Sequence, residues 1–396
     1  MTKADKEGQR KAPILRFKGF TDDWEQRKLG KVATFINGRA YKQNELLDSG
    51  KYKVLRVGNF YTNDSWYYSN LELADKYYID KGDLVYTWSA TFGPHIWDGE
   101  KVIYHYHIWK IELSKFLDRD FTLQILEADK AKLLANTNGS TMIHVTKKDM
   151  ESKVISLPII EEQKQIGLYL TKFDTLIALY ERKTRLLGKV RTFLTQRLFS
   201  NSSKVSLYFD NKNWSEHKIS EFLTERNEKV VPNSSIPLVS FTVEKGVTPK
   251  SKRYNREFLV KDDNKKYKIT KKDDIVYNPA NLKFGAIARN KFGNAAFSPI
   301  YVTFITKLNP AFTEFLVRRK NFINLALKYQ EGTVYERMAV KSKDFLNLKI
   351  YLPNSSRDIN HIAQILQSLD TLVSLNKNKV SLITLIKKEL LNTMFI

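Results

Sequence analysis

The sequence predicts an α+β fold in which two mixed α/β domains are each followed by a long helix, and the two helices pair as a coiled coil. The first observation is a repeat. Motifs at Asn138–Thr141, Lys148–Asp149 and Leu157–Pro158 recur about 195 residues later in this 396-residue chain. The second observation is a heptad pattern of apolar residues that ends each half. A period this long is too large for a solenoid unit, so it indicates two similar domains.

Each half begins with an aromatic-rich entry, over Phe20–Glu25 in the first half and Phe209–Glu216 in the second. The entries contain the matched residues Trp24 and Trp214. With 42% hydrophobic and 12% aromatic residues, both halves are expected to fold, and each is long enough to bury its own core.

A buried strand is the next shared element. Lys81–Tyr86 matches Lys272–Tyr277, and β-branched and aromatic residues after an Asp-containing turn are typical of a strand in a core. A glycine-containing loop follows each strand, over Thr87–Pro94 and Asn278–Gly285.

Alternating and helical segments complete each half. The alternation of apolar residues over Val102–Ile111 and Ile300–Ile305 predicts further strands. A short helix is expected over Phe121–Leu134, with a counterpart over Phe312–Tyr329.

The two long helices carry apolar spines whose spacing alternates between four and three residues. This strict heptad favours a left-handed coiled coil, and each spine is narrow enough to need a partner helix. The spines align position for position, and even their interruptions agree, since Arg191 falls where Lys387 falls. The residues predicted to form the helix–helix interface are Ile166, Leu170, Phe173, Ile177, Tyr180, Leu187, Leu194, Leu198, Ile362, Leu366, Leu369, Val373, Val380, Ile383 and Leu390.

Proline marks the start of each helical segment, at Pro158 and Pro353, because proline disfavours helix at the preceding residue. The predicted limits are 1–157 and 201–352 for the domains and 158–200 and 353–396 for the helices. Asn201–Ser203 is expected to be a linker, and Asn354–Ser356 supplies N-caps for the second helix.

Composition restricts the partners. The net charge is +23 and the isoelectric point is near 9.7, which favours a polyanionic partner. The absence of cysteine excludes disulfides, thiol nucleophiles and cysteine-ligated metals. The first 18 residues are basic without an apolar stretch, and no apolar run reaches the roughly 20 residues that cross a bilayer. We therefore expect a soluble cytoplasmic protein.

Most catalytic signatures are missing. No two glycines stand one residue apart and no Gly-Lys-Ser/Thr occurs, which excludes the usual dinucleotide and phosphate-binding loops. His105 and His107 alternate on an expected strand, where packing is a better interpretation than metal binding. Tyr277–Asn281 only partly matches the Asn-Pro-Pro-aromatic loop of amino-methylating enzymes, and Glu151–Lys153 lacks the Asp partner of a nuclease site. We therefore predict no catalytic and no metal-binding residues.

Binding is the better interpretation. Lysine and arginine neutralise phosphates, and Arg, Asn and Gln pair with base edges. The two loops that follow the matched strands are the firmest candidates, because they are equivalent in position yet different in residues. The DNA-binding candidates are Arg39, Lys42, Arg56, Asn59, Thr87, Trp88, Ser89, Thr91, Lys245, Lys250, Lys252, Arg253, Tyr254, Asn278, Asn281 and Lys283.

The whole chain resembles the specificity (S) subunits of type I restriction-modification systems. Leu15–Gly30 looks like the N-terminal entry of that family, and Lys147–Asp149 followed by Ile155–Ile166 looks like its passage into the first helix. The second copy departs from the pattern, since Pro353–Asp358 lacks the Glu-Glu-Gln that follows the first proline. This difference leaves the role of those acidic residues open.

The resemblance implies two target-recognition domains, related by a pseudo-two-fold repeat and separated by two antiparallel helices whose length sets a gap in a split double-stranded DNA target. It implies no catalytic centre and no cofactor in this chain. Two modification subunits would supply S-adenosylmethionine chemistry, and restriction subunits would supply ATP- and magnesium-dependent translocation and cleavage. The alternatives are a stand-alone nuclease or methyltransferase with an unrecognised site, and a coiled-coil scaffold that binds RNA.

Overall fold

The computed structural model describes residues 12–61, 63–89, 91–136, 145–199, 214–249, 265–332 and 338–395. The predicted motifs at Asn138–Thr141 and Thr333 and the predicted linker Asn201–Ser203 lie outside these residues. The chain divides into two compact units. Unit 1 comprises Met1–Glu181 and Lys377–Ile396, and unit 2 comprises Arg182–Asn376.

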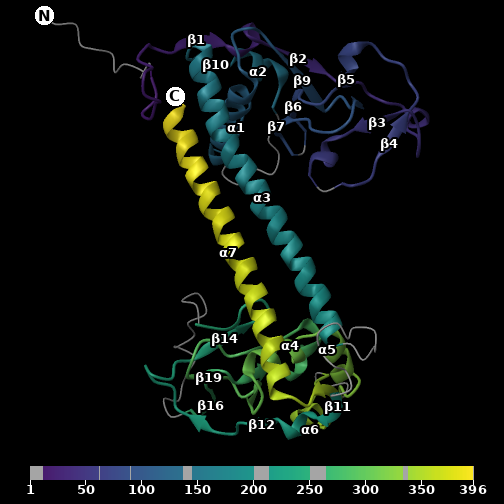
Figure 1. Ribbon diagram of the computed structural model, residues 1–396, viewed down its shortest axis with the longest axis vertical. Coiled ribbons are helices and arrows are strands. Elements are labelled where there is room, and N and C mark those ends of the chain that lie inside the picture. The colour runs from purple at the N-terminus through teal and green to yellow at the C-terminus, as the bar shows by residue number, and fades with distance from the viewer. Residues whose placement is uncertain are drawn as a thin grey trace, which may run out of the picture. The chain divides into compact units, whose positions relative to one another are not determined.

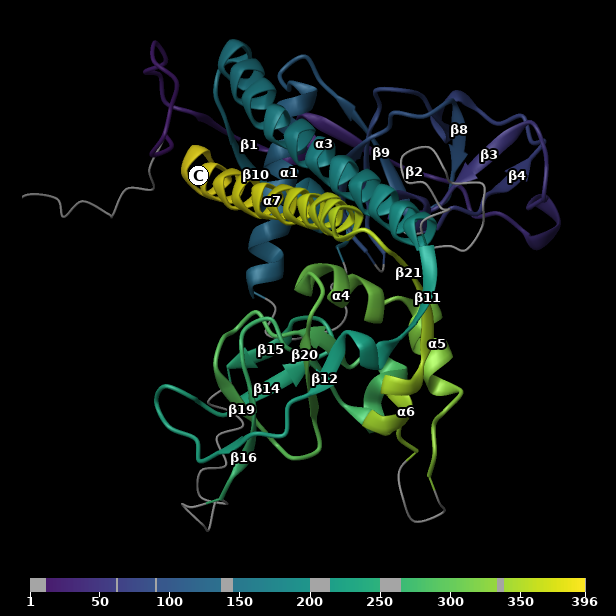
Figure 2. The ribbon, with the colours of Figure 1, turned by 60° about the horizontal axis from the view of Figure 1, so that its bottom comes forward.

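Unit 1 contains two four-stranded sheets and a two-stranded ribbon, and both sheets are visible in Figures 1 and 2. The first sheet has the order β2-β9-β6-β7 and is antiparallel throughout. The second has the order β4-β3-β8-β5, and its β3–β8 pair is parallel. The strands are β1 (Glu25–Lys28), β2 (Ala33–Asn37), β3 (Tyr52–Leu55), β4 (Tyr67–Ser69), β5 (Tyr78–Ile79), β6 (Leu84–Thr87), β7 (Gly93–Ile96), β8 (Val102–Tyr104), β9 (Ile108–Leu113) and β10 (Val154–Leu157).

Unit 2 repeats the first sheet and the ribbon but not the second sheet. The order β12-β20-β17-β18 reproduces β2-β9-β6-β7, and the β11–β21 ribbon reproduces β1–β10. In place of the second sheet stand a three-stranded sheet β13-β16-β19 and the hairpin β14–β15. The strands are β11 (Trp214–Lys218), β12 (Leu223–Glu225), β13 (Lys229–Val230), β14 (Val239–Thr242), β15 (Gly246–Pro249), β16 (Tyr267–Thr270), β17 (Ile275–Tyr277), β18 (Ile287–Arg289), β19 (Ala295–Phe297), β20 (Val302–Thr306) and β21 (Lys349–Pro353).

The turn before the matched strands β6 and β17 has the same construction in both units. The carboxylate of Asp83 accepts a hydrogen bond from the backbone N–H of Asp80 at 2.8 Å. Asp274 accepts from the N–H of Lys271 at 2.7 Å. This explains why both copies place an aspartate directly before the strand, since its side chain closes the turn.

Short helices cover the sheets. In unit 1, α1 (Arg119–Asn136) spans the predicted helix, and α2 (Lys147–Ser152) precedes β10. In unit 2, the predicted single helix Phe312–Tyr329 is wrong: α4 (Pro310–Val317) and α5 (Lys320–Leu327) are separate, and α6 (Ser342–Asn347) precedes β21. The break occurs because the backbone of Arg319 is extended, with φ −66° and ψ 138°.

The long helices α3 (Ile160–Leu198) and α7 (Ser356–Met394) each begin shortly after the predicted proline. Each contributes one half to each unit. In unit 1 the Lys387 ammonium contacts the Asp174 carboxylate at 2.5 Å, and in unit 2 Arg191 forms an ion pair with Asp370. These two pairs are equivalent in the repeat, and within each unit the helix halves run antiparallel (Figure 1).

All fifteen residues of the predicted helix–helix interface are buried or half-buried. The ends of the helices enter the cores of the units. Phe395 packs against Trp24 and Phe121 in unit 1, with ring centroids 6.5 Å and 5.5 Å apart. Phe199 packs against Phe312 at 5.3 Å in unit 2. No helix in the described part of the chain is long and apolar enough to cross a bilayer.

Candidate nucleic-acid interface

The surface of unit 1 beside the β6–β7 hairpin is aromatic. The indole N–H of Trp88 donates to the carbonyl of Tyr106 at 3.0 Å, and its ring stacks on Trp109 with centroids 5.9 Å apart. The edge of the same indole meets His107 at 4.9 Å. Tyr106 is exposed, and Ser89 and Thr91 flank this cluster in the hairpin. The arrangement presents aromatic rings for stacking or apolar contact with bases.

His105 and His107 belong to a turn, which corrects the expectation that they alternate along one strand. The predicted strand Val102–Ile111 is divided into β8 and β9, which lie in different sheets. Burial, with smaller contributions from His107 and Arg56, lowers the pKa of His105 to about 4, and burial also lowers the pKa of His107. Both rings are therefore neutral at physiological pH. No cluster of metal-ligating side chains occurs among the residues that the structure describes.

The predicted cations of unit 1 are held in place by neighbouring side chains. The guanidinium of Arg39 makes two hydrogen bonds of 2.7 and 2.9 Å to the Glu45 carboxylate, which lowers the pKa of Glu45 to about 2. Arg56 lies over the ring of Tyr67, 4.2 Å from its centroid. Asn59 donates to the carbonyl of Ser65 at 2.9 Å, whereas Lys42 is exposed.

Two candidates do not line an open surface, and that expectation is corrected. Thr87 is fully buried, and its hydroxyl donates to the carbonyl of Gly93 across the hairpin. Asn278 is buried, and its side-chain oxygen caps a 3-10 helix by accepting from the N–H groups of Ala280 and Asn281. Both residues shape the hairpins that present their neighbours.

The equivalent hairpin of unit 2, between β17 and β18, carries a cationic and apolar tip. The 3-10 helix Pro279–Phe284 ends at Gly285, which has φ 81°, a conformation that favours glycine. Phe284 is 63% exposed, and the Lys283 ammonium lies 5.0 Å from the centroid of its ring. Asn281 is exposed on the same helix.

The β14–β15 hairpin of unit 2 lies beside this tip. A Cβ atom at Gly285 would lie 3.6 Å from a methyl group of Val243, so the two loops are in contact. Val243 and Lys245 are both exposed. The other predicted contacts of this unit, Lys250, Lys252, Arg253 and Tyr254, lie outside the described residues.

A cation cluster in unit 2 was not found from the sequence. The nearly buried carboxylate of Glu314 contacts Arg289 at 3.3 Å, Lys291 at 2.9 Å and Arg318 at 3.4 Å. Arg318 also donates to the carbonyl of Val243, which connects the cluster to the β14–β15 hairpin. Only the Glu314–Arg318 spacing along a helix was visible in the sequence; the other two cations come from β18 and the residues that follow it.

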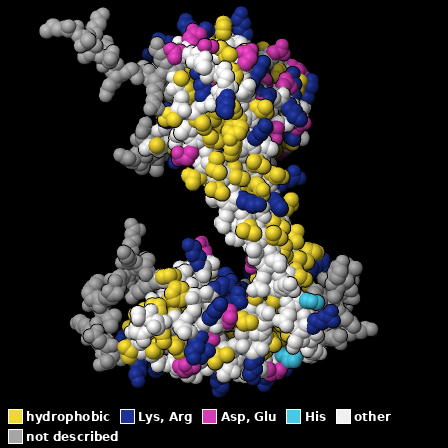
Figure 3. All heavy atoms as spheres, turned by 60° about the vertical axis from the view of Figure 1, so that its left-hand side comes forward, with side chains coloured by type: hydrophobic (Ala, Val, Ile, Leu, Met, Phe, Trp, Pro, Cys, Tyr) yellow, Lys and Arg dark blue, Asp and Glu magenta, His cyan; other side chains and the backbone are white. Residues whose placement is uncertain are grey.

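A second apolar stripe on the long helices was also missed. Eleven leucine, isoleucine and valine residues of α3 and α7 outside the spines are 41–58% exposed, and eight of them form matched pairs. In Figure 3, hydrophobic side chains gather over the long helices. The stripe follows the repeat, because Leu176, Leu179, Leu186 and Val190 of α3 match Leu372, Leu375, Leu382 and Ile386 of α7. Each unit therefore has four of these residues, two from each helix.

The Glu-Glu-Gln segment at the start of α3 has a structural role. Glu162 is fully buried and accepts two hydrogen bonds from Arg16, at 2.7 and 2.8 Å. The amide of Gln163 donates to the carbonyls of Phe116 and Pro158, and its oxygen accepts from the N–H of Asp118. These bonds fix the helix to unit 1.

Comparison with known proteins identifies relatives that are similar to part or most of the chain. A family model described as the type I restriction modification DNA specificity domain matches residues 21–187. The type I restriction enzyme MjaVIII specificity subunit of Methanocaldococcus jannaschii is 25% identical over 94% of this chain and 92% of its own length. The EcoBI specificity subunit of Escherichia coli is 27% identical over 40% of this chain and 33% of its own length.

A solved structure shares the fold. The S subunit of a type I restriction-modification system from M. genitalium superposes with a TM-score of 0.64 at 15% identity, covering 97% of this chain and 99% of that one. The α+β architecture with two mixed domains and two long helices, expected from the sequence, is confirmed.

Proposed function

We propose that the chain is a type I restriction-modification specificity subunit, the DNA-reading component of such a complex. Each domain reads one half of a bipartite duplex target. The recognition domains are residues 1–157 and 201–352, and the helical segments 158–200 and 353–396 set the unspecified gap between the half-sites. A stand-alone nuclease or methyltransferase is not favoured, because the relatives are specificity subunits.

The observation that carries this proposal is one repeated sheet with two different hairpin tips. The strand orders β2-β9-β6-β7 and β12-β20-β17-β18 agree, yet the tip of one hairpin carries Trp88 and the other carries Lys283 and Phe284. Sheets with the same strand order hold the loops in equivalent places, and unlike side chains contact unlike base edges. Such a pair suits an asymmetric split target.

The repeated apolar stripe supports the docking of two equal partners. Exposed leucines at matched positions in both units offer the same surface twice, and an exposed apolar patch of this kind marks a protein–protein contact. We assign this surface to two modification subunits, which would bring S-adenosylmethionine. Restriction subunits, which would bring ATP and magnesium, complete the complex in the cytoplasm.

Mapping of methylated positions in host DNA tests the proposal. The expected result is a single target with two defined parts and a fixed gap. Exchange of residues 214–352 for those of another specificity subunit is expected to change one part and leave the other and the gap intact. The matched control exchanges residues 12–157 and should change only the other part. If one exchange altered both parts, independent reading by two domains would be wrong.

A further inference from the structure

Unit 2 contains a cationic pocket at the end of α3. Its volume is about 450 Å³, and it lies against the junction between α4 and α5. No acidic residue is among the described residues that line it. The lining residues are Arg191, Thr192, Thr195, Gln196, Phe199, Arg319, Lys320 and Asn321.

Arg319 is held in this pocket without a carboxylate partner among the described residues. Its guanidinium stacks on Phe199, 4.2 Å from the ring centroid, and donates to the carbonyls of Phe199 and Leu316 at 3.1 and 3.2 Å. Burial lowers the pKa of Arg319 to about 10, so the side chain still carries its charge at neutral pH. A desolvated cation bound only to neutral carbonyls retains a strong electrostatic attraction for an anion.

The neighbouring groups complete a set of donors. Lys320 is exposed at the first position of α5, and that helix begins without a side-chain cap. Arg191 is neutralised by Asp370, and the hydroxyls of Thr192 and Thr195 donate to carbonyls of their own helix. The side-chain amides of Gln196 and Asn321 add donors to the lining of the pocket. Three cations less one carboxylate leave a local charge of +2.

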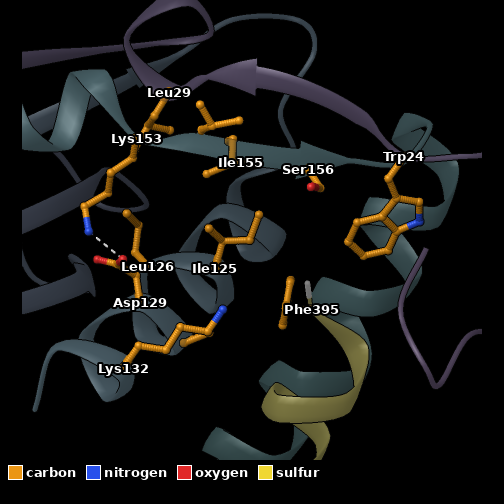
Figure 4. Close-up of a pocket in the computed structure, with 12 residues that line it drawn as sticks. Trp24, Leu29, Ile125, Leu126, Asp129, Lys132, Lys153, Ile155, Ser156 and Phe395 are labelled. Carbon is orange, nitrogen blue, oxygen red and sulfur yellow. Dashed lines mark hydrogen bonds and ion pairs between the residues drawn. The ribbon is translucent and has the colours of Figure 1, made fainter. Parts of the chain in front are cut away.

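The equivalent region of unit 1 lacks this character. A pocket beside Phe395, the counterpart of Phe199, has a volume of about 160 Å³ and is lined mainly by apolar side chains (Figure 4). Its one carboxylate, Asp129, forms an ion pair with Lys153 at 2.5 Å. The cationic pocket therefore occurs in unit 2 and not at the equivalent place in unit 1. The fold that the two units share does not explain its charge.

We propose that the pocket formed by Arg191, Arg319 and Lys320 in unit 2 binds a phosphate group. Planar guanidinium groups match the geometry of phosphate oxygens, and the amides of Gln196 and Asn321 donate to the oxygens that remain. A dianionic phosphate balances the local charge of +2. The phosphate belongs either to the DNA backbone or to a free phosphate compound, and this site goes beyond the proposed reading of bases.

Calorimetric titration of the full-length chain with inorganic phosphate, in a chloride buffer of constant ionic strength, tests the site. We expect one site, with a Kd on the order of 1 mM. Lys320→Ala, which removes an exposed side chain, should weaken binding at least fivefold. Arg319→Met, which removes the guanidinium but keeps an unbranched side chain, should do the same. The matched control is Lys328→Ala, an exposed lysine just past the end of α5 that does not line the pocket, which should leave Kd within twofold.

The absence of binding up to about 20 mM phosphate, or equal weakening by Lys320→Ala and Lys328→Ala, would overturn the proposal. A second measurement distinguishes the sources, by following duplex DNA affinity as salt is varied. If the phosphate is that of DNA, Lys320→Ala lowers the slope of log K against log salt by about 0.9. If DNA affinity is unchanged while phosphate binding is lost, the ligand is a free phosphate. Neither result depends on the split target, so failure here leaves the proposed function intact.

Discussion

The two units share a sheet, a ribbon and a helix-end aromatic residue, but they present unlike chemistry at the same places. Beside the β6–β7 hairpin, unit 1 displays Trp88, Tyr106 and two neutral histidines. At the matching hairpin, unit 2 displays Lys283 and an exposed Phe284. The side chains that build the strands are constrained by the core, whereas the tips are free to diverge. The comparison teaches that recognition residues should be sought where two similar copies differ.

The start of each long helix shows the opposite case. The helix begins at the same position in both units, but different interactions fix it there. In unit 1, Gln163 makes three hydrogen bonds and Glu162 binds Arg16. In unit 2, the matching Ile359 is buried in the hydrophobic core. The Glu-Glu-Gln segment is therefore one of two solutions to anchoring a helix.

The largest expected effect tests whether both units depend equally on a helix-end phenylalanine. Phe395→Ala should lower the free energy of unfolding of unit 1 by about 3–5 kcal/mol, because a buried ring is removed. Phe199→Ala is the matched change in unit 2. Hydrogen exchange followed by mass spectrometry should place each loss in its own unit. An equal loss in both units from either change would contradict their independence.

The next effect concerns the Arg16–Glu162 pair. Arg16→Met leaves a fully buried carboxylate without its partner and should cost about 3 kcal/mol. Five of the six tryptophans lie in unit 1, so denaturation followed by tryptophan fluorescence reports this unit. The double variant Arg16→Met/Glu162→Met should recover much of the loss. If the double variant is no more stable than the single one, the buried charge is not the cause.

A smaller effect is expected in assembly. Leu179→Asp in unit 1 or Leu375→Asp in unit 2 should each weaken binding of one modification subunit at least tenfold, which is about 1.4 kcal/mol. The measurement is the stoichiometry and affinity of the purified complex. Ser374→Asp, an exposed change beside the stripe, is the control. Wild-type assembly by the doubly substituted chain would contradict the assignment of this surface.

Acid should affect unit 1 before unit 2. His95 and His105 have pKa values of about 4, against 6.5 for an exposed histidine. Between these values the unfolded chain binds more protons, so stability falls as the pH falls from 6.5 towards 4. We expect a loss on the order of 1 kcal/mol, after allowance for solvent. His95→Gln should flatten the dependence measured by tryptophan fluorescence, and exposed His361→Gln should not.

The smallest effect is expected at the tip of the unit 2 hairpin. Lys283→Ala should weaken DNA binding by less than tenfold and lower the salt slope by about 0.9, because one phosphate contact is lost. Phe284→Ala should instead alter the preference among sequences of one half-site, with the salt slope unchanged. If both variants changed the salt slope and the sequence preference equally, the separate roles of Lys283 in phosphate contact and Phe284 in base contact would be wrong.

The repeat and the heptads were sufficient to predict the long helices and the shared strands, because both signals are periodic and local. The sequence did not reveal that Arg319 interrupts the helix after β20, since arginine is a good helix former and its contacts with Phe199 are distant in the sequence. The burial of Thr87 and Asn278 was hidden for a similar reason, because hairpin geometry decides which loop residues turn inwards. The Glu314 cluster joins residues from two elements, which no spacing rule brings together.

The antiparallel helices have a consequence for synthesis. The core of unit 1 includes Met394 and Phe395, which are synthesised after unit 2 has been completed at Asn376. At the usual rates of translation, unit 1 therefore lacks part of its core for roughly 10–40 s after its first segment has been made. Unit 1 begins first in the sequence but is completed after unit 2, so unit 2 can fold while the core of unit 1 still lacks Met394 and Phe395.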